Sequence, residues 1–165
     1  MSIMRKLSVL SITLVTGILA GCSTPTTSNQ NEKAEAEVLA ALESFQTSYN
    51  QMDVNKISDH FNNPTTLIAP QGVSVTIARN EFNEVFGPVI NYLENAEYKK
   101  STWRNVDVKV LDNELAIASA DVTQYDVNDQ VIENFGVTYS MSHDGEGWKI
   151  SAITTHPPSD HDETK

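Results

Sequence analysis

The spacing of apolar residues changes once along the chain, and this change constrains the fold more than any other feature. From Glu32 to Leu93 most apolar side chains recur every three to four residues, the period of amphipathic helices. From Lys99 to His156 they alternate with polar residues, the period of strands with one buried face. Helices followed by a run of antiparallel strands predict an α+β fold, with the N-terminal helices on one face of a strongly curved sheet.

Three helices are expected in the first half of the domain. The first starts at Glu32, and Asp53 can cap a short second helix by accepting hydrogen bonds from its first turn. The third runs from Phe82 to Leu93 and contains Gly87-Pro88. Because proline removes a helical hydrogen bond, a kink or a break is predicted there.

The strands are bounded by turn residues. Thr65–Ala69 and Val73–Ile77 predict a short hairpin around Pro70-Gln71-Gly72, and Asn63 must leave the helical conformation because a proline follows it. Asp, Asn and Gly residues then separate the longer segments of the C-terminal half. These four predicted strands are Lys99–Leu111, Leu115–Tyr125, Val131–His143 and Trp148–His156.

The N-terminus has the pattern of an export signal. Arg5 and Lys6 precede an apolar run from Leu7 to Ala20. As a helix this run would be about 21 Å long, which is short of the roughly 30 Å hydrocarbon core of a membrane. Residues 1–21 are therefore predicted to be a signal peptide rather than a transmembrane anchor.

A short motif ends the apolar run. It consists of Leu19, Ala20, Gly21 and Cys22. This motif resembles the lipobox of bacterial lipoproteins, and the resemblance implies cleavage before Cys22 and a diacylglycerol on its sulfur. Two or three acyl chains, at about 0.8 kcal/mol per buried methylene, would hold the chain on a membrane. The alternative is an ordinary signal peptide with an incidental cysteine.

Ser23 bears on the location of the protein. In lipoproteins of Gram-negative bacteria, a serine after the cysteine directs the product to the periplasmic face of the outer membrane. A host without an outer membrane would carry it on the outer face of its single membrane. The expected location is therefore the cell envelope, with the chain lipid-anchored.

The mature chain divides into three parts. Residues 22–31 contain no large apolar side chain and are predicted to be a flexible tether. Residues 32–156 can form one compact domain without internal repeats. Residues 157–165 are polar and acidic, and we expect a disordered tail.

Composition excludes several classes of function. Cys22 is the only cysteine, so the domain has no disulfide and no cysteine-based metal site or nucleophile. The net charge of −11 argues against nucleic acid as a partner. No phosphate loop, esterase elbow or zinc-type spacing is present, so neither cofactor nor metal is expected. Loose metal binding in the tail would incur the entropy of ordering it. That tail carries His156, Asp160, His161, Asp162 and Glu163.

The order of the elements resembles the nuclear transport factor 2-like (NTF2-like) superfamily, which includes SnoaL-like polyketide cyclases and ketosteroid isomerases. The motifs that carry the resemblance are Tyr49-Asn50 before Asp53 and Trp148-Lys149-Ile150 on the last strand. It implies a cone-like domain with a pocket at its open end. Catalytic members tend to carry histidines or carboxylates on the closing strands. Here Ala152 and Thr154 follow Ile150, so no catalytic dyad is carried over.

Five residues are candidates for a pocket site. Asp121 or His156 could act as a general base, with Tyr125 or Tyr139 as hydrogen-bond donor and Trp103 as a flat apolar wall. In the alternative interpretation Asp121 and His156 face water and the aromatic residues are core. His60 is interpreted as a helix-terminus residue.

Three functions follow from these features. The first is a non-catalytic envelope lipoprotein whose domain binds a small apolar ligand or an envelope protein. The second is an isomerase- or cyclase-type enzyme with Asp121 or His156 as base. The third is a structural role in which two copies pair through the open sheet face. Which applies depends on whether the pocket is open or filled by Trp103, Phe82, Phe86 and Tyr139.

Overall fold

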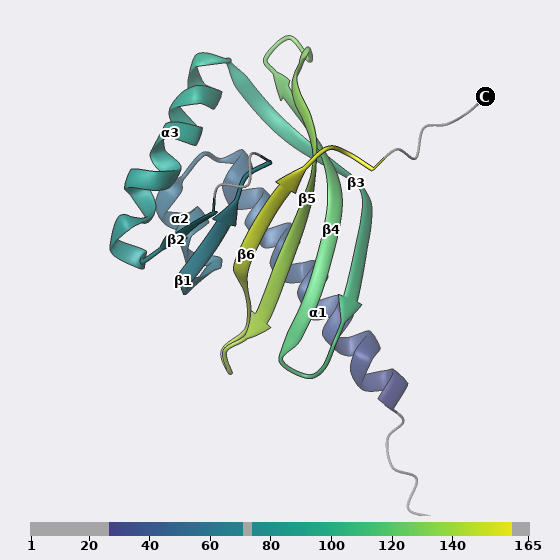
Figure 1. Ribbon diagram of the computed structural model, residues 1–165. Helices are drawn as coiled ribbons and strands as arrows, with labels where there is room; N and C mark the ends of the chain where they lie inside the picture. Colours follow the sequence, from purple (N-terminus) through teal and green to yellow (C-terminus); the bar gives the residue numbers. More distant parts are fainter. Residues whose placement is uncertain (1–26, 71–73, 160–165) are drawn as a thin grey trace, which may run out of the picture.

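The computed structural model of the chain describes residues 27–70 and 74–159 (Figure 1). Residues 1–26, 71–73 and 160–165 lie outside this described part, and they include the predicted signal peptide and Cys22. The helices are α1 (Thr27–Asn50), α2 (Val54–Asp59) and α3 (Phe82–Asn95), with a 3-10 turn at Arg79–Glu81. The strands are β1 (Phe61–Ile68), β2 (Ser74–Ile77), β3 (Tyr98–Val110), β4 (Leu115–Asp126), β5 (Val131–His143) and β6 (Trp148–His156).

The strands form one sheet in the order β2-β1-β6-β5-β4-β3. The pairs are antiparallel except β1 and β6, which run parallel. The expected α+β fold, with helices first and a curved, mostly antiparallel sheet after them, is confirmed, and the sequence did not predict the parallel pairing of β1 with β6. Strands β3 to β6 form the expected meander, and its last strand returns beside β1, far from it in sequence.

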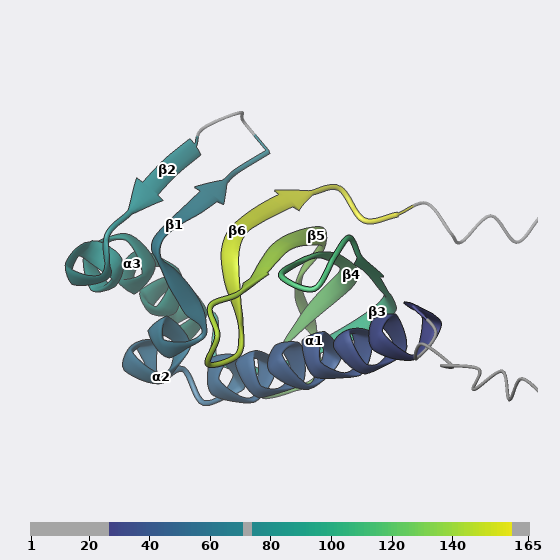
Figure 2. The same cartoon turned by 90° about the horizontal axis from the view of Figure 1, so that it is seen from below.

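The helices cover the concave face of the sheet. Figure 2 shows the sheet bent over α1, with α2 and α3 beside β1 and β2. Val38, Leu42 and Phe45 of α1 belong to the buried core. Strand β4 contributes the small residues Ala118 and Ala120 to the same core. The concave face is therefore the core side of every central strand.

The junction between α2 and β1 follows the predicted chemistry. The Asp53 carboxylate accepts hydrogen bonds from the backbone N–H groups of Asn55 and Lys56, which confirms the cap. His60 ends α2, and its Nε2 lies 2.9 Å from the Ser48 hydroxyl oxygen. Partial burial lowers the pKa of His60. His60 is therefore a helix-terminus residue, as interpreted from the sequence.

Helix α1 begins earlier than the sequence predicted, and of the kink or break predicted at Pro88 the break does not occur. Helix α1 begins at Thr27, so the last five residues of the predicted tether are helical. Helix α3 continues through Pro88 without a break. Pro88 is exposed, whereas Phe86 and Ile90 are buried, so packing of the inner face outweighs the hydrogen bond lost on the solvent side. None of the helices in the described part of the chain combines the length and hydropathy needed to cross a membrane.

Strand β3 contains an irregularity that affects the outer face of the sheet. Its pairing with β4 shifts between Arg104 and Asp107, and Asn105 has a φ of 52°. The extra residue moves the alternation by one position, so Trp103 and Val108 both pack against the core. The bulge also turns the Asn105 side chain toward β4, where it contacts Asp121.

Candidate functional site

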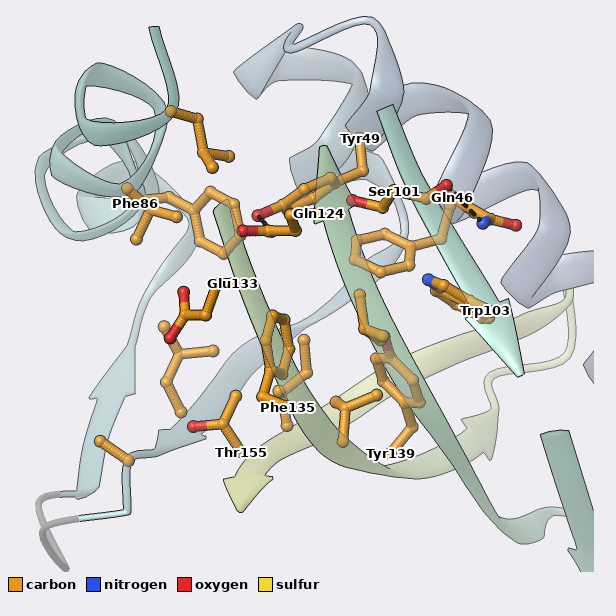
Figure 3. Close-up of a pocket in the computed structure, with 18 of the residues that line it drawn as sticks. Gln46, Tyr49, Phe86, Ser101, Trp103, Gln124, Glu133, Phe135, Tyr139 and Thr155 are labelled. Atoms are coloured by element: carbon orange, nitrogen blue, oxygen red, sulfur yellow. Dashed lines mark hydrogen bonds between the residues drawn. The ribbon is translucent and has the colours of Figure 1, made fainter. Parts of the chain in front are cut away.

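A cavity of about 420 Å³ lies between the helices and the concave face of the sheet (Figure 3). Helices α1 and α3 contribute Phe45, Gln46, Tyr49, Phe86, Val89, Tyr92 and Leu93 to its lining. The sheet and the end of β1 contribute Leu67, Ile68, Ala69, Pro70, Ser101, Trp103, Val122, Gln124, Glu133, Phe135, Val137, Tyr139, Ile153 and Thr155. The curvature of the sheet keeps this volume open because α1 covers one part of the concave face and α3 another.

The wall of the cavity is largely aromatic. The Phe45 ring touches several neighbours, with ring centroids 5.9 Å from Tyr139 and 6.3 Å from Trp103. Trp103 and Tyr139 are stacked at 5.6 Å and an interplanar angle of 27°. Tyr49 meets Phe86 edge-on across the other side. These rings form a rigid apolar wall, since aromatic side chains have few rotatable bonds and pack tightly.

Hydrogen bonds orient the polar groups between the helices and the sheet. The Gln124 amide donates to the Tyr49 hydroxyl at 3.2 Å, and the Gln46 amide donates to the Ser101 carbonyl at 3.2 Å. Asn50 accepts from both the Tyr98 hydroxyl and the Ser101 backbone N–H. Tyr49 and Asn50, part of the motif that predicted the fold, therefore tie the end of α1 to β3 and β4.

Two tyrosine hydroxyls of the lining remain protonated at every physiological pH. Burial is the main cause that raises the pKa of Tyr49, with the charge of Glu133 adding to it. Burial likewise raises the pKa of Tyr139, whose hydroxyl has no hydrogen-bond partner among the described residues. Both hydroxyls can therefore donate a hydrogen bond to a bound molecule. Neither can serve as a base near neutral pH.

Comparisons with known proteins support the same fold. A model of the family described as NTF2-like protein (DUF6841) matches residues 34–158. The chain belongs to this family. The NTF2-like resemblance is thereby confirmed over the whole globular domain, while no curated protein sequence matches significantly.

Solved structures agree with the family assignment. An NTF2-like protein with a cystatin-like fold from Novosphingobium aromaticivorans has a TM-score of 0.64 and 10% identity, over 80% of this chain and 86% of its own. An NTF2-like protein from Pseudomonas putida KT2440 has a TM-score of 0.63 and 14% identity, over 81% of this chain and 93% of its own. A ketosteroid isomerase-like protein from Erwinia carotovora atroseptica has a TM-score of 0.59 and 15% identity, over 74% of this chain and 95% of its own. At these identities the similarity shows the fold alone.

The candidate residues separate onto the two faces of the NTF2-like sheet. Trp103 and Tyr139 line the cavity. Asp121 and Tyr125 do not, because on β4 the residues that face the helices are Ala118, Ala120, Val122 and Gln124. The choice of Asp121 as a pocket base was therefore wrong: it lies on the convex face. Tyr125 is half-buried, with the Lys100 ammonium 5.5 Å from its ring centroid.

Asp121 is saturated with hydrogen bonds. Its carboxylate accepts from the Ser159 backbone N–H at 2.8 Å, the Ser159 hydroxyl at 2.6 Å and the Asn105 amide at 2.7 Å. The two bonds from Ser159 are the main cause that lowers the pKa of Asp121 to about 2. Such a carboxylate is a weak base, and its role in the NTF2-like domain is structural.

His156 lies on the same convex face and is also engaged. Its Nδ1 donates to the Pro157 carbonyl at 2.7 Å, which leaves Nε2 to accept from the Thr138 hydroxyl at 3.1 Å. The ring covers Gly136, where a β-carbon would overlap it. The choice of His156 as a pocket base was wrong for this reason. Residues 157–159, which the sequence assigned to a disordered tail, are ordered against the sheet.

The sequence interpretation missed several lining residues. Two of the polar lining residues, Gln124 and Glu133, could have been identified from the alternation of side chains along their strands. Gln124 shares its face of β4 with Val122, and Glu133 shares its face of β5 with Phe135 and Tyr139. Extending the alternation from Tyr139 back along β5 would have found Glu133. Among the lining residues on the helices, Phe86 was named in the sequence analysis as one that could fill the pocket. The described residues contain no cluster of three metal-binding side chains, and the acidic end of the tail lies outside them.

Proposed function

We propose that this chain is a lipid-anchored envelope protein whose NTF2-like domain binds a small, mostly apolar molecule without transforming it. The cavity carries this proposal. Protein interiors are close-packed and contain few voids larger than a water molecule. An open space of about 420 Å³ inside an aromatic core falls in the usual range of small-molecule sites.

Asp121 and His156 lie outside the cavity, and Glu133, the carboxylate of the described lining, is exposed to water, which favours binding over proton transfer. A general base must lie within hydrogen-bond reach of the proton that it removes. Asp121 and His156 lie on the convex face, with their polar atoms bonded to Ser159, Thr138 and Pro157. The cavity side offers the Tyr49 and Tyr139 hydroxyls, which can orient a ligand by donating hydrogen bonds.

The anchor is supported by the lipobox-like motif that ends in Cys22. Since α1 begins at Thr27, four residues separate the modified cysteine from the first helix. These residues span at most about 14 Å when extended. The domain would therefore work close to the membrane that holds it, in the envelope and on the periplasmic side of an outer membrane where one exists.

The ligand can be identified by what the protein retains. We would purify the full chain from its native membrane in mild detergent and analyse extracted small molecules by mass spectrometry. Ile153→Trp fills the cavity from β6 and should reduce the retained molecule at least about tenfold. Thr154→Trp places the same bulk on the opposite face of the same strand and should retain it fully.

The outcomes of this experiment are distinct. Equal retention by both variants, or no retained molecule in any of the three proteins, contradicts the proposal. Retention of an envelope protein in place of a small molecule would also contradict it and favour partner binding. Circular dichroism of both variants confirms that loss of ligand does not reflect loss of the fold.

The anchor has its own test. Mass spectrometry of the N-terminal peptide should find Cys22 at the amino terminus with a diacylglycerol and a further acyl chain, and labelled palmitate should enter the protein. Cys22→Ala should abolish the label and leave the leader uncut. A mature chain with an unmodified Cys22 sulfur would contradict the anchor and leave the cavity proposal standing.

A further inference from the structure

The aromatic rings of the cavity have a charge preference. Seven of the 21 lining residues are Phe, Tyr or Trp. The face of each ring carries a partial negative charge and attracts a cation within about 6 Å of the ring centroid. An aromatic lining therefore discriminates between molecules of equal shape and different charge, and it favours the positive ones.

The charged groups of the lining act in the same direction. Glu133 is the carboxylate of the described lining, which holds no lysine, arginine or histidine. Figure 3 shows the Glu133 side chain among the lining residues, between Phe86 and Thr155 in that view. The protein as a whole is also strongly acidic, with a net charge of −11, and would attract cations from solution.

We infer that the molecule held in the cavity is a small organic cation, an amine or quaternary ammonium compound with an apolar body. This inference rests on the proposed binding function and names the class of its ligand. The positive group lies beside Glu133 and faces the aromatic rings, and the apolar body extends toward Trp103 and Tyr139. An anionic ligand would meet the Glu133 carboxylate without a compensating cation.

The geometry of β5 supports this orientation. Glu133, Phe135, Val137 and Tyr139 follow one another on the concave face of a single strand. Alternate residues are about 7 Å apart, so Glu133 lies about 20 Å from Tyr139 along the strand. Glu133 is exposed, whereas Val137 and Tyr139 are buried. The strand therefore presents a negative, solvent-accessible end and an apolar interior end to one molecule.

Three probes of similar shape test the charge preference. Phenyltrimethylammonium is positive, tert-butylbenzene is its neutral isostere, and benzenesulfonate is negative. Binding to the full chain in phosphatidylcholine nanodiscs is measured by titration calorimetry, with empty discs subtracted. Glu133→Gln should lower the affinity for phenyltrimethylammonium about fivefold, and Glu133→Lys should lower it at least about tenfold. Both variants should change the affinity of tert-butylbenzene less than about twofold.

A second variant and a salt series separate local from general electrostatics. Glu146→Gln removes the same charge from the turn beyond the other end of β5, outside the cavity lining, and should leave all three affinities unchanged. Raising the salt concentration from 20 to 200 mM should lower the affinity of the wild type for phenyltrimethylammonium, because salt screens the accessible carboxylate. The affinity of Glu133→Gln should fall less.

Three results would overturn the inference. The first is equal affinity of phenyltrimethylammonium for the wild type and Glu133→Gln. The second is tighter binding of benzenesulfonate than of phenyltrimethylammonium. The third is binding of tert-butylbenzene alone, which would leave the proposed apolar site intact. If none of the probes binds, the cation inference is wrong, and the Ile153→Trp retention experiment then decides whether the binding function fails with it.

Discussion

The two faces of the central strands use their polar residues in opposite ways. On the convex face, Asp121 accepts three hydrogen bonds and both ring nitrogens of His156 are bonded. On the concave face, the Tyr139 hydroxyl has no partner among the described residues, and Tyr49 accepts one bond from Gln124. The two candidate bases, Asp121 and His156, thus make hydrogen bonds within the protein, whereas the tyrosine hydroxyls that can still donate a hydrogen bond lie in the cavity.

The difference follows from what covers each face. The convex surface beside β5 is covered by the chain itself, because residues 157–159 turn back across Gly136 and supply Ser159 to Asp121. Buried polar groups need partners, and here the chain provides them. The concave surface is covered by helices that leave a cavity of about 420 Å³. Partners for its free hydroxyls must therefore come from a bound molecule or from water.

The largest expected effect lies at the centre of the concave face. Phe45 is 4% exposed and contacts five other rings, namely Tyr49, His60, Phe61, Trp103 and Tyr139. Phe45→Ala should lower the free energy of unfolding by about 3–5 kcal/mol, because it deletes a buried ring and enlarges the cavity. Leu115→Ala on the convex face, where Leu115 is 47% exposed, should cost less than about 1 kcal/mol. Urea unfolding measures both, and similar losses would show that the convex face is also part of a core.

The next effect tests the covering of the convex face. A β-carbon on Gly136 would overlap the His156 ring and lie 2.6 Å from the Pro157 carbonyl oxygen. Gly136→Ala should therefore displace the segment from His156 to Ser159 and destabilise the protein by about 1–3 kcal/mol. Gly147→Ala is the control, since nothing lies within 4 Å of its β-carbon. Thermal unfolding of the two variants should differ, and equal midpoints would mean that residues 157–159 do not pack on the sheet.

Much of the fold could be predicted from the sequence, because the change of hydrophobic period and the turn residues are local signals. Strand β4 shows where this reasoning fails. Both of its faces contain apolar residues, and the larger side chains, Leu115 and Ile117, alternate onto the same face as Asp121, which favours that face as the inner one. In the structure Ile117 is 40% exposed and the alanines face inward, where they are part of the buried core. The size of the apolar side chains therefore did not indicate which face of β4 is buried.

The environment of Asp121 depends on contacts that no local pattern contains. Asn105 reaches it through a bulge in β3, and Ser159 reaches it from 38 positions along the chain. Neither contact alters the alternation of β4 itself, so Asp121 in isolation resembled a pocket carboxylate. Trp103 and Tyr139 were placed in the cavity wall because large aromatic residues at alternating positions almost always face a core.

The hydrogen bonds of Asp121 on the convex face predict that the stability of the protein depends on pH. Its folded pKa is about 2, below the unfolded value near 3.9, so ionised Asp121 stabilises the folded state above about pH 4. This stabilisation is lost as the pH falls from about 4 to 2. Because Ser159 is exposed and water competes for its bonds, we expect about 1–2 kcal/mol. The advantage of the wild type over Asp121→Asn should largely vanish by pH 2, and Asp107→Asn, at an exposed position on β3, is the matched control.

The smallest expected effect on stability is the most informative about the concave face. Tyr139→Phe removes a hydroxyl without a partner among the described residues, so the free energy of unfolding should change by less than about 0.5 kcal/mol. Tyr49→Phe removes the acceptor of the Gln124 amide and should cost about 1 kcal/mol. If the cavity binds a molecule that accepts a hydrogen bond from Tyr139, the Tyr139→Phe protein should retain less of it although its stability is unchanged. A large loss of stability in Tyr139→Phe would instead mean that this hydroxyl is bonded within the protein, and the contrast between the two faces would no longer hold.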